Sequence, residues 1–155
     1  MSKTKQIAVL IALVVLVTAF IFSNSMRNSV QSNEASDKVL GILAFVTDFF
    51  DKLFGEADWN YIIRKGAHLT EFGALGILVS ALVFKVKVHF EKHLMGYGLF
   101  YVLLVAVTDE FIQSFSDRTS SVKDVFIDFA GALLGIIIIT LISSRRKSAK
   151  SNVIS

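Results

Sequence analysis

The sequence predicts an all-α integral membrane protein: a bundle of four transmembrane helices with both termini in the cytoplasm, and an amphipathic interfacial helix in the outer loop between the first two spans. Three observations predict this class. Apolar residues make up 54% of the 155 residues and charged residues only 19%, so a chain this short cannot bury its apolar surface in its own core. Four stretches are long and apolar enough to cross a bilayer, which takes about 20 residues. Lysines and arginines gather at the ends of these stretches, where they act as topology signals.

The predicted spans belong to a single membrane domain that covers residues 1–155. They run over residues 7–22, 62–84, 95–115 and 122–142. The first stretch could instead be a cleaved signal peptide, because lysines precede it and small residues follow it. Its length and the lack of an Ala-x-Ala site favour an uncleaved anchor. Residues 143–155 are polar and basic, and we expect them to form a disordered tail.

Basic residues near the span ends predict the orientation. They precede the first span, separate the second from the third, and follow the fourth: Lys3, Lys5, Lys85, Lys87, Lys92, Arg145, Arg146, Lys147 and Lys150. An even number of spans places all three groups on one side of the membrane, and the positive-inside rule makes that side cytoplasmic. The loop of residues 24–60 then lies outside, and we expect a multi-pass protein of the plasma membrane.

The outer loop carries apolar residues at helical spacing between Val39 and Leu53, interrupted by charged residues on the opposite face. This pattern predicts an amphipathic helix that lies on the outer membrane surface or caps the bundle. Trp59 and Tyr61 follow it, as expected at a headgroup boundary.

Ionisable residues inside a membrane cost at least ~2.5 kcal/mol each at a helix centre, so they need partners or a wet cavity. In the second span, Arg64, His68 and Glu71 stand at i, i+4 and i+7 and share one helix face. The basic side chains of this group could balance carboxylates that come from the other spans.

The outer ends of the last two spans supply those carboxylates. Asp109 and Glu110 lie near the end of the third span, and Gln113 can hydrogen-bond to either of them. In the fourth span, Asp128 lies one turn deeper than Asp124. Gly131 and Gly135 continue the stripe of Asp128 and predict a close approach of another helix, because small residues let backbones meet.

Antiparallel threading brings these three clusters to one depth, just beneath the outer surface. The candidate ligand-binding residues are Arg64, His68, Glu71, Asp109, Glu110, Gln113, Arg118, Asp124 and Asp128. The inner halves of the same spans are almost wholly apolar, which favours a half-depth pocket over a pore. Cysteine is absent, so a thiolate nucleophile or thiolate metal site is excluded.

Two long motifs resemble those of the VanZ-like family. The first is RKGAHLTEFGALG at residues 64–76; the second is TDEFIQSFSDR at residues 108–118, followed by DVFIDFAGALLG at residues 124–135. Many members have Pro-Gly where this chain has Ser116-Asp117, and Asn is frequent at the position of Asp128. The resemblance implies a membrane protein of the cell envelope. It also implies a link to low-level resistance to teicoplanin, a lipid-bearing glycopeptide, with which the family's namesake is associated.

Three interpretations of the polar residues stay open. In the first, Arg64 and Arg118 clamp a phosphate or carboxylate of an amphiphile, and the carboxylates and Gln113 bind its hydroxyl or amine groups. The amphiphile would be an envelope lipid, a lipid-linked wall precursor or a lipoglycopeptide. In the second, the pocket is a membrane-embedded enzyme for transfer or hydrolysis on a phosphate-bearing lipid. Its candidate catalytic residues are His68, Glu71, Asp109 and Glu110. In the third, the charges only neutralise one another and hold the helices together.

A divalent ion is a variant of the enzyme hypothesis. His68 and Glu71, at i and i+3, could ligate it with Asp109, Asp124 and Asp128, but this spacing is loose and the nearby arginines oppose it. We therefore predict no metal and no cofactor. The basic residues do not form the stripe that a nucleic acid needs, so the expected partners are membrane lipids or a lipid-linked envelope molecule.

Overall fold

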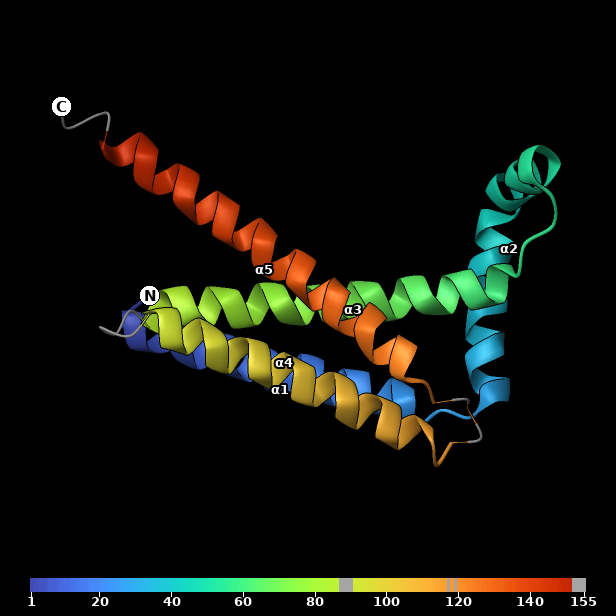
Figure 1. Ribbon diagram of the computed structural model, residues 1–155, viewed down its shortest axis with the longest axis horizontal. Coiled ribbons are helices and arrows are strands. Elements are labelled where there is room, and N and C mark those ends of the chain that lie inside the picture. Colours follow the sequence, from blue (N-terminus) through green and yellow to red (C-terminus); the bar gives the residue numbers. More distant parts are fainter. Residues whose placement is uncertain (87–90, 117, 119, 152–155) are drawn as a thin grey trace.

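Every regular element in the described part of the chain is a helix, as the sequence predicts. The computed structural model describes residues 1–86, 91–116, 118 and 120–151, without the side chains of residues 54, 91, 92 and 146–151. Five helices lie within these ranges: α1 Lys3–Ser25, α2 Ser29–Phe54, α3 Trp59–Val86, α4 Glu91–Gln113 and α5 Val122–Ser151 (Figure 1).

Four of the five helices are long and apolar enough to cross a membrane: Lys3–Ser25, Trp59–Val86, His93–Gln113 and Val122–Arg145. They coincide with the four predicted spans, and their ends differ by a few residues. The prediction of a disordered tail from residue 143 is wrong as far as Ser151, because α5 continues to that residue. Extending an existing helix requires no new nucleation, so polar residues can prolong it. Residues 152–155 of that tail and Lys87 of the predicted basic loop lie outside the described ranges.

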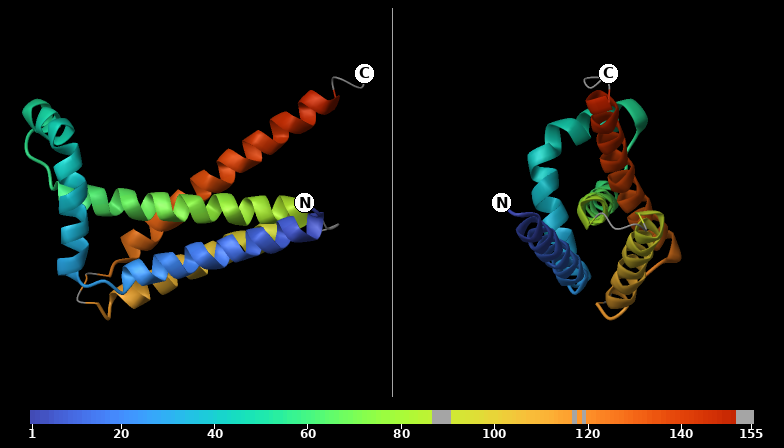
Figure 2. Two further views of the ribbon diagram at one scale, coloured as in Figure 1. Left: turned by 180° about the vertical axis from the view of Figure 1, so that it is seen from behind. Right: turned by 90° about the vertical axis from the view of Figure 1, so that its left-hand side faces the viewer.

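The spans alternate in direction, and α2 stands across one end of them (Figures 1 and 2). Helices α1, α3 and α4 run alongside one another, whereas α5 crosses α3 obliquely and diverges toward its C-terminal end. The N-terminus and the end of α5 both lie opposite α2. The end of α1, the start of α3, the end of α4 and the start of α5 therefore meet at the α2 end.

The crossing of α3 and α5 is a direct contact of backbones, as the predicted glycine stripe requires. A Cβ at Gly131 would overlap the carbonyl oxygen of Leu69, and one at Gly135 would overlap that of Gly73. On the facing helix, a Cβ at Gly76 would lie 2.8 Å from the carbonyl carbon of Ala132. Only hydrogen fits at these positions, which holds α3 and α5 in one register.

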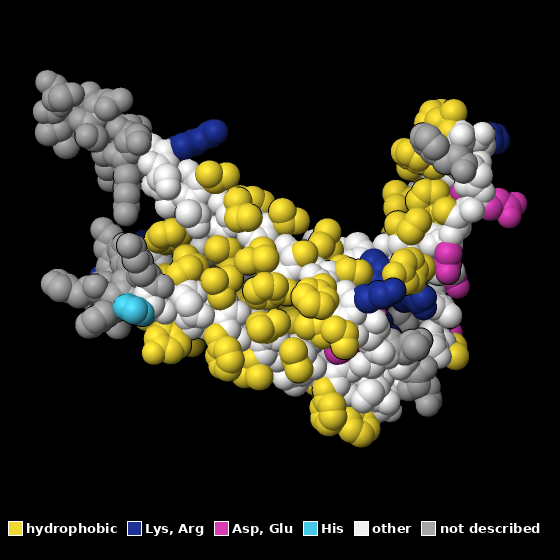
Figure 3. Space-filling view, viewed as in Figure 1, with side chains coloured by type: hydrophobic (Ala, Val, Ile, Leu, Met, Phe, Trp, Pro, Cys, Tyr) yellow, Lys and Arg dark blue, Asp and Glu magenta, His cyan; other side chains and the backbone are white. Residues whose placement is uncertain are grey.

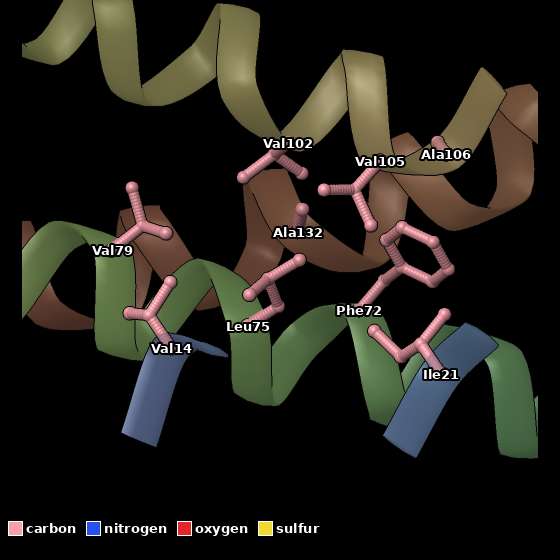
Figure 4. Packing of buried hydrophobic residues seen from close by; sticks show 9 residues of the cluster. All are labelled: Val14, Ile21, Phe72, Leu75, Val79, Val102, Val105, Ala106 and Ala132. Atoms are coloured by element: carbon pink, nitrogen blue, oxygen red, sulfur yellow. The ribbon is translucent and has the colours of Figure 1, made fainter. Parts of the chain in front are cut away.

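A small apolar core joins the four spans. Phe72 and Leu75 of α3 are fully buried against Val102 of α4, Ile21 of α1 and Ala132 of α5 (Figure 4). Many other apolar side chains are exposed and cover the outside of the bundle (Figure 3). A surface of this kind suits a lipid environment, because a soluble protein rarely exposes so large an apolar area.

Local interactions fix both ends of α2, which connects the end of α1 to the start of α3. Its N-cap is Asn28, whose side chain accepts a hydrogen bond from the backbone N–H of Gln31 at 2.9 Å. Its C-cap is Gly55, whose φ of 89° is a left-handed conformation that glycine adopts without strain. The indole Nε1 of Trp59 then donates to Asp51 at 2.8 Å, which ties the start of α3 to the last turns of α2.

Candidate functional site

His68 lies where α3, α4 and α5 meet, directly before Leu69, whose backbone contacts Gly131 in the glycine crossing. Its Nδ1 is 3.6 Å from Oδ2 of Asp109 and 3.5 Å from Oδ1 of Asp128. Both aspartates are fully buried. The structure therefore brings together three of the predicted site residues, one from each of three spans.

Asp109 is held by neighbours from two helices. Gln113, one turn later in α4, donates from Nε2 to its Oδ2 at 2.7 Å, which confirms the pairing predicted from their spacing. Ser25, the last residue of α1, donates from Oγ to its Oδ1. Each oxygen of this buried carboxylate thus accepts a hydrogen bond, as a buried charge requires.

Asp128 is different from Asp109. Neither of its carboxylate oxygens has a hydrogen-bond partner in the described part of the chain, and its side chain is only 1% exposed. His68 Nδ1 also makes no hydrogen bond, since its two contacts with carboxylates are long. A buried polar group without a partner is costly and calls for an explanation.

Glu71 lies beside α1 and does not belong to the group of His68, Asp109 and Asp128, here called the His68 cluster. Its Oε1 accepts a hydrogen bond from Nδ2 of Asn24 at 2.8 Å. Glu71 shares a helix face with His68 and is a candidate catalytic residue beside it, but the carboxylates against His68 Nδ1 are Asp109 and Asp128. The i, i+3 spacing brings Glu71 near the face of His68, yet each side chain turns to a different neighbouring helix.

The end of α1 is a part of the site that the charge pattern does not reveal. Asn24 and Ser25 both reach carboxylates of other helices, but they are uncharged and follow a long apolar span. The sequence does contain a signal for this part of the site: one amide and one hydroxyl side chain end the span at the depth of the charged clusters.

Arg118 lies on the other side of the imidazole, in the loop between α4 and α5. Its Nη2 is 3.4 Å from Nε2 of His68. A guanidinium can only donate, so this contact makes Nε2 the acceptor and assigns the proton of a neutral His68 to Nδ1, which faces the two aspartates. Burial lowers the pKa of Arg118 from its ordinary value, although arginine is so basic that the group stays charged at neutral pH.

The other predicted residues lie around the rim of the site and take separate partners. Glu110 accepts a hydrogen bond from the backbone N–H of Ser121 at 2.9 Å, so it does not share the neighbours of Asp109. Asp124 forms an ion pair with Lys65. Arg64 donates to the amide oxygen of Asn33 on α2 at 2.6 Å.

Two cavities open between the spans and α2. One has a volume of about 160 Å³, well above the roughly 10–15 Å³ that one water molecule needs. Its polar wall consists of Asn24, Arg27, Ser32, Ser36, Arg64, His68, Glu71 and Arg118. The other has a volume of about 320 Å³, and its lining residues include Arg64, Gln113, Arg118 and Asp124. Figure 3 shows the basic side chains gathered at this end of the bundle.

An apolar groove continues from the first cavity between α2 and α3. It has a volume of about 630 Å³, and most of its wall is aliphatic or aromatic: Val39, Leu43, Val46, Trp59, Ile62, Ile63 and Ala67. The groove and the 160 Å³ cavity share four residues, Val39, Ile63, Ala67 and Glu71. A charged compartment and an apolar compartment therefore adjoin.

Comparisons with known proteins give one match. A model of the VanZ/LLP1 family matches residues 9–143, which include all of the site described above. Comparison with curated proteins and with solved structures found no match.

Proposed function

Because the chain belongs to the VanZ/LLP1 family of membrane proteins, we propose that it is a multi-pass protein of the bacterial cell envelope whose cavity binds the anionic headgroup of an amphiphile from the outer leaflet. The ligand class comprises envelope lipids, lipid-linked wall precursors and lipoglycopeptides such as teicoplanin. The observation that carries this proposal is the continuity between an arginine-lined cavity and an apolar groove.

The charges of the cavity suit an anionic group. Three guanidinium groups, from Arg27, Arg64 and Arg118, line a space of about 160 Å³. Guanidinium groups bind phosphate and carboxylate through paired N–H donors, and partial burial strengthens that attraction. The Glu71 carboxylate in the same wall is an acceptor for hydroxyl or amine groups of a headgroup.

The adjoining groove suits an acyl or prenyl chain. Burying each CH₂ group in an apolar environment contributes about 0.8 kcal/mol. A chain seated between α2 and α3 would contact Leu43, Val46 and Ile62 while its headgroup stays among the arginines. Neither compartment alone would select an amphiphile over a simple anion or a simple hydrocarbon.

The arrangement of the helices supports a location at the outer leaflet. Lys3 of α1, Lys85 of α3 and Arg145 of α5 belong to helix ends opposite α2, and the positive-inside rule assigns that side to the cytoplasm. The site then faces outward. Helix α2 lies across the spans, and its side chains of Ile42 and Phe45 are 84% and 86% exposed, as expected for an interfacial helix that dips its apolar face into lipid.

Quenching of the single tryptophan by brominated lipids tests the proposal directly. Trp59 lines the groove, so a bromine-bearing acyl chain that enters it will quench the indole fluorescence. The protein would be reconstituted with brominated phosphatidylglycerol, which is anionic, or brominated phosphatidylcholine, which is zwitterionic. We expect stronger quenching by the anionic lipid. We also expect that preference to fall about tenfold or more in Arg118→Gln, because a lost charge-assisted hydrogen bond costs ~1.5–3 kcal/mol.

Lys38→Gln is the matched control. Lys38 is an exposed cation of α2 that does not line the cavity, so its removal changes the net charge equally but should leave the lipid preference intact. Equal quenching by both lipids in the wild type, or an unchanged preference in Arg118→Gln, would refute the proposal.

A second candidate function is hydrolysis of a phosphate-bearing lipid, which the orientation of His68 favours. Its Nε2 faces Arg118, which lines the cavity with it, while Nδ1 faces two carboxylates, an arrangement that suits a general base. Nε2 would take a proton from water as the oxygen attacks phosphorus. The bond from phosphorus to the headgroup or lipid oxygen would break, and that oxygen would receive the proton. Arg118 would stabilise the charge on the phosphoryl oxygens.

Lipid extracts distinguish the second function from simple binding. Cells that express the wild type should accumulate a dephosphorylated lipid or a released headgroup, and His68→Gln should abolish this change. Identical lipid profiles with the wild type, with His68→Gln and without the protein would exclude the enzyme hypothesis and leave the binding proposal untouched.

A further inference from the structure

The His68 cluster has a feature that binding of an anionic headgroup does not use. Two buried aspartates direct their oxygens toward one imidazole nitrogen, and three donor atoms, one from each residue, lie within 4.8 Å of one another. The residues come from α3, α4 and α5, and the glycine crossing sets the distance between the two on α3 and α5, His68 and Asp128. Stabilising the bundle does not require them, since two buried carboxylates beside one imidazole are costly.

The two distances from His68 Nδ1 to the aspartates match the edges of a metal coordination sphere. Ligand atoms about 2.0–2.2 Å from a tetrahedral Zn²⁺ lie about 3.3–3.6 Å from one another. His68 Nδ1 is 3.5 Å from Asp128 Oδ1 and 3.6 Å from Asp109 Oδ2. These separations are too long for good hydrogen bonds and suit atoms that share an ion between them.

The unpartnered atoms independently point to a ligand. Asp128 is 1% exposed, and neither of its oxygens has a hydrogen-bond partner among the described residues. His68 Nδ1 also has none. Asp109, in contrast, is oriented by Ser25 and Gln113, as ligating carboxylates usually are by neighbouring donors.

We propose that His68, Asp109 and Asp128 bind a divalent transition-metal ion of the Zn²⁺ type. One imidazole nitrogen and two carboxylate oxygens form a donor set that suits such ions, and three protein ligands leave a coordination position for water or a ligand oxygen. His68 lines the 160 Å³ cavity, which gives the ion a route from the outer surface. Two ionised aspartates balance the charge of the ion, so the site as a whole is neutral.

The metal and the contact between Arg118 and His68 exclude each other. When Nδ1 binds an ion, the imidazole proton moves to Nε2, and Nε2–H then faces the N–H groups of Arg118, 3.4 Å away. Two donors cannot pair, so Arg118 must turn away when the ion binds. Removing the guanidinium should therefore leave the metal affinity unchanged or raise it. This expectation is opposite to the effect of the same substitution on the binding of an anionic lipid.

Metal content of the purified protein tests the proposal. The full chain, purified in detergent without a histidine tag, would be equilibrated with Zn²⁺ and measured by mass spectrometry. Co²⁺ would serve as a visible-absorption probe of coordination. We expect about one ion per chain, with affinity reduced at least tenfold in Asp128→Asn. Asp48→Asn removes an exposed carboxylate of α2 and should bind like the wild type.

The outcomes separate this proposal from the proposed function. Failure of the wild type to bind Zn²⁺ saturably, or equal binding by Asp128→Asn, would overturn the metal site. If Asp128→Asn does not fold, Arg118→Gln decides. Metal binding retained or tightened in this variant supports the site, and weakened metal binding overturns it, whatever the result of the lipid assay. The quenching assay is measured without added metal, so either proposal can fail while the other stands.

Discussion

Substitution of Gly131 by alanine should weaken the α3–α5 crossing on which the site depends. A Cβ at this position would lie 3.1 Å from the carbonyl carbon and Cα of Leu69, and closer still to the carbonyl oxygen, whereas ordinary contact begins at 3.4 Å. The two backbones must therefore separate by more than 0.3 Å, the difference for the carbon atoms, because the oxygen is closer still. Leu69 follows His68 directly and Gly131 lies one turn after Asp128, so the separation acts on the pair that is 3.5 Å apart.

The size of the effect follows from two opposed contributions. Alanine gains up to about 1 kcal/mol of helix propensity over glycine. Overpacking of a tight contact costs about 1–3 kcal/mol. Gly96→Ala in α4 isolates the first contribution, because a Cβ there meets no atom within 4 Å. Gly131→Ala should thus be less stable than Gly96→Ala by about 1–3 kcal/mol.

Thermal unfolding of the two variants in one detergent measures this difference. Gly131→Ala should lose several degrees in Tm relative to Gly96→Ala. It should also bind Zn²⁺ more weakly if the metal site exists, since the crossing sets the distance between His68 and Asp128. Equal Tm values for the two variants would refute the argument, because the backbone contact would then not constrain the bundle.

Three further predictions concern the end of α1, the topology and the biological effect. Ser25→Ala removes a hydroxyl that donates to a buried carboxylate of α4, so it should cost about 1–3 kcal/mol in thermal unfolding, and the exposed Ser23→Ala should cost nothing measurable. Equal stabilities would show that this hydrogen bond is not formed. The chain has no cysteine, so a membrane-impermeant maleimide applied to intact cells should label Lys38→Cys and leave Lys3→Cys unlabelled until the membrane is permeabilised. The reverse pattern would invert the topology. In a strain that the wild type makes tolerant to teicoplanin, Arg118→Ala should lose the tolerance at an unchanged membrane level, and full tolerance would contradict a role of the cavity.

The positions of the spans could be predicted because each depends on a local property. A helix crosses the membrane when about 20 consecutive residues are apolar, and this condition needs no knowledge of neighbours. The close approach at Gly131 and Gly135 could also be predicted, since a stripe of small residues has few other uses in a span. The continuation of α5 past residue 143 could not, because polar composition alone does not end a helix already formed.

The partners within the site depended on how each helix is rotated and how far it is shifted along its neighbours. Spacing in the sequence placed Glu71 on the face of His68. Its hydrogen bond with Asn24, however, depends on how α1 packs against α3. It is likewise the packing of α4 and α5 against α3 that turns Asp109 and Asp128 toward the imidazole.

The sequence by itself therefore determined that acids and bases from three spans gather near one end of the bundle, because helix direction and residue number set depth. The tertiary structure decided which of them touch. Successive residues of a helix point about 100° apart, so a shift by one residue is enough to turn a side chain from one neighbouring helix to another. Whether an uncharged side chain such as Ser25 lies in the site depends on the rotation of its helix, and the pattern of charges along the chain does not predict that rotation.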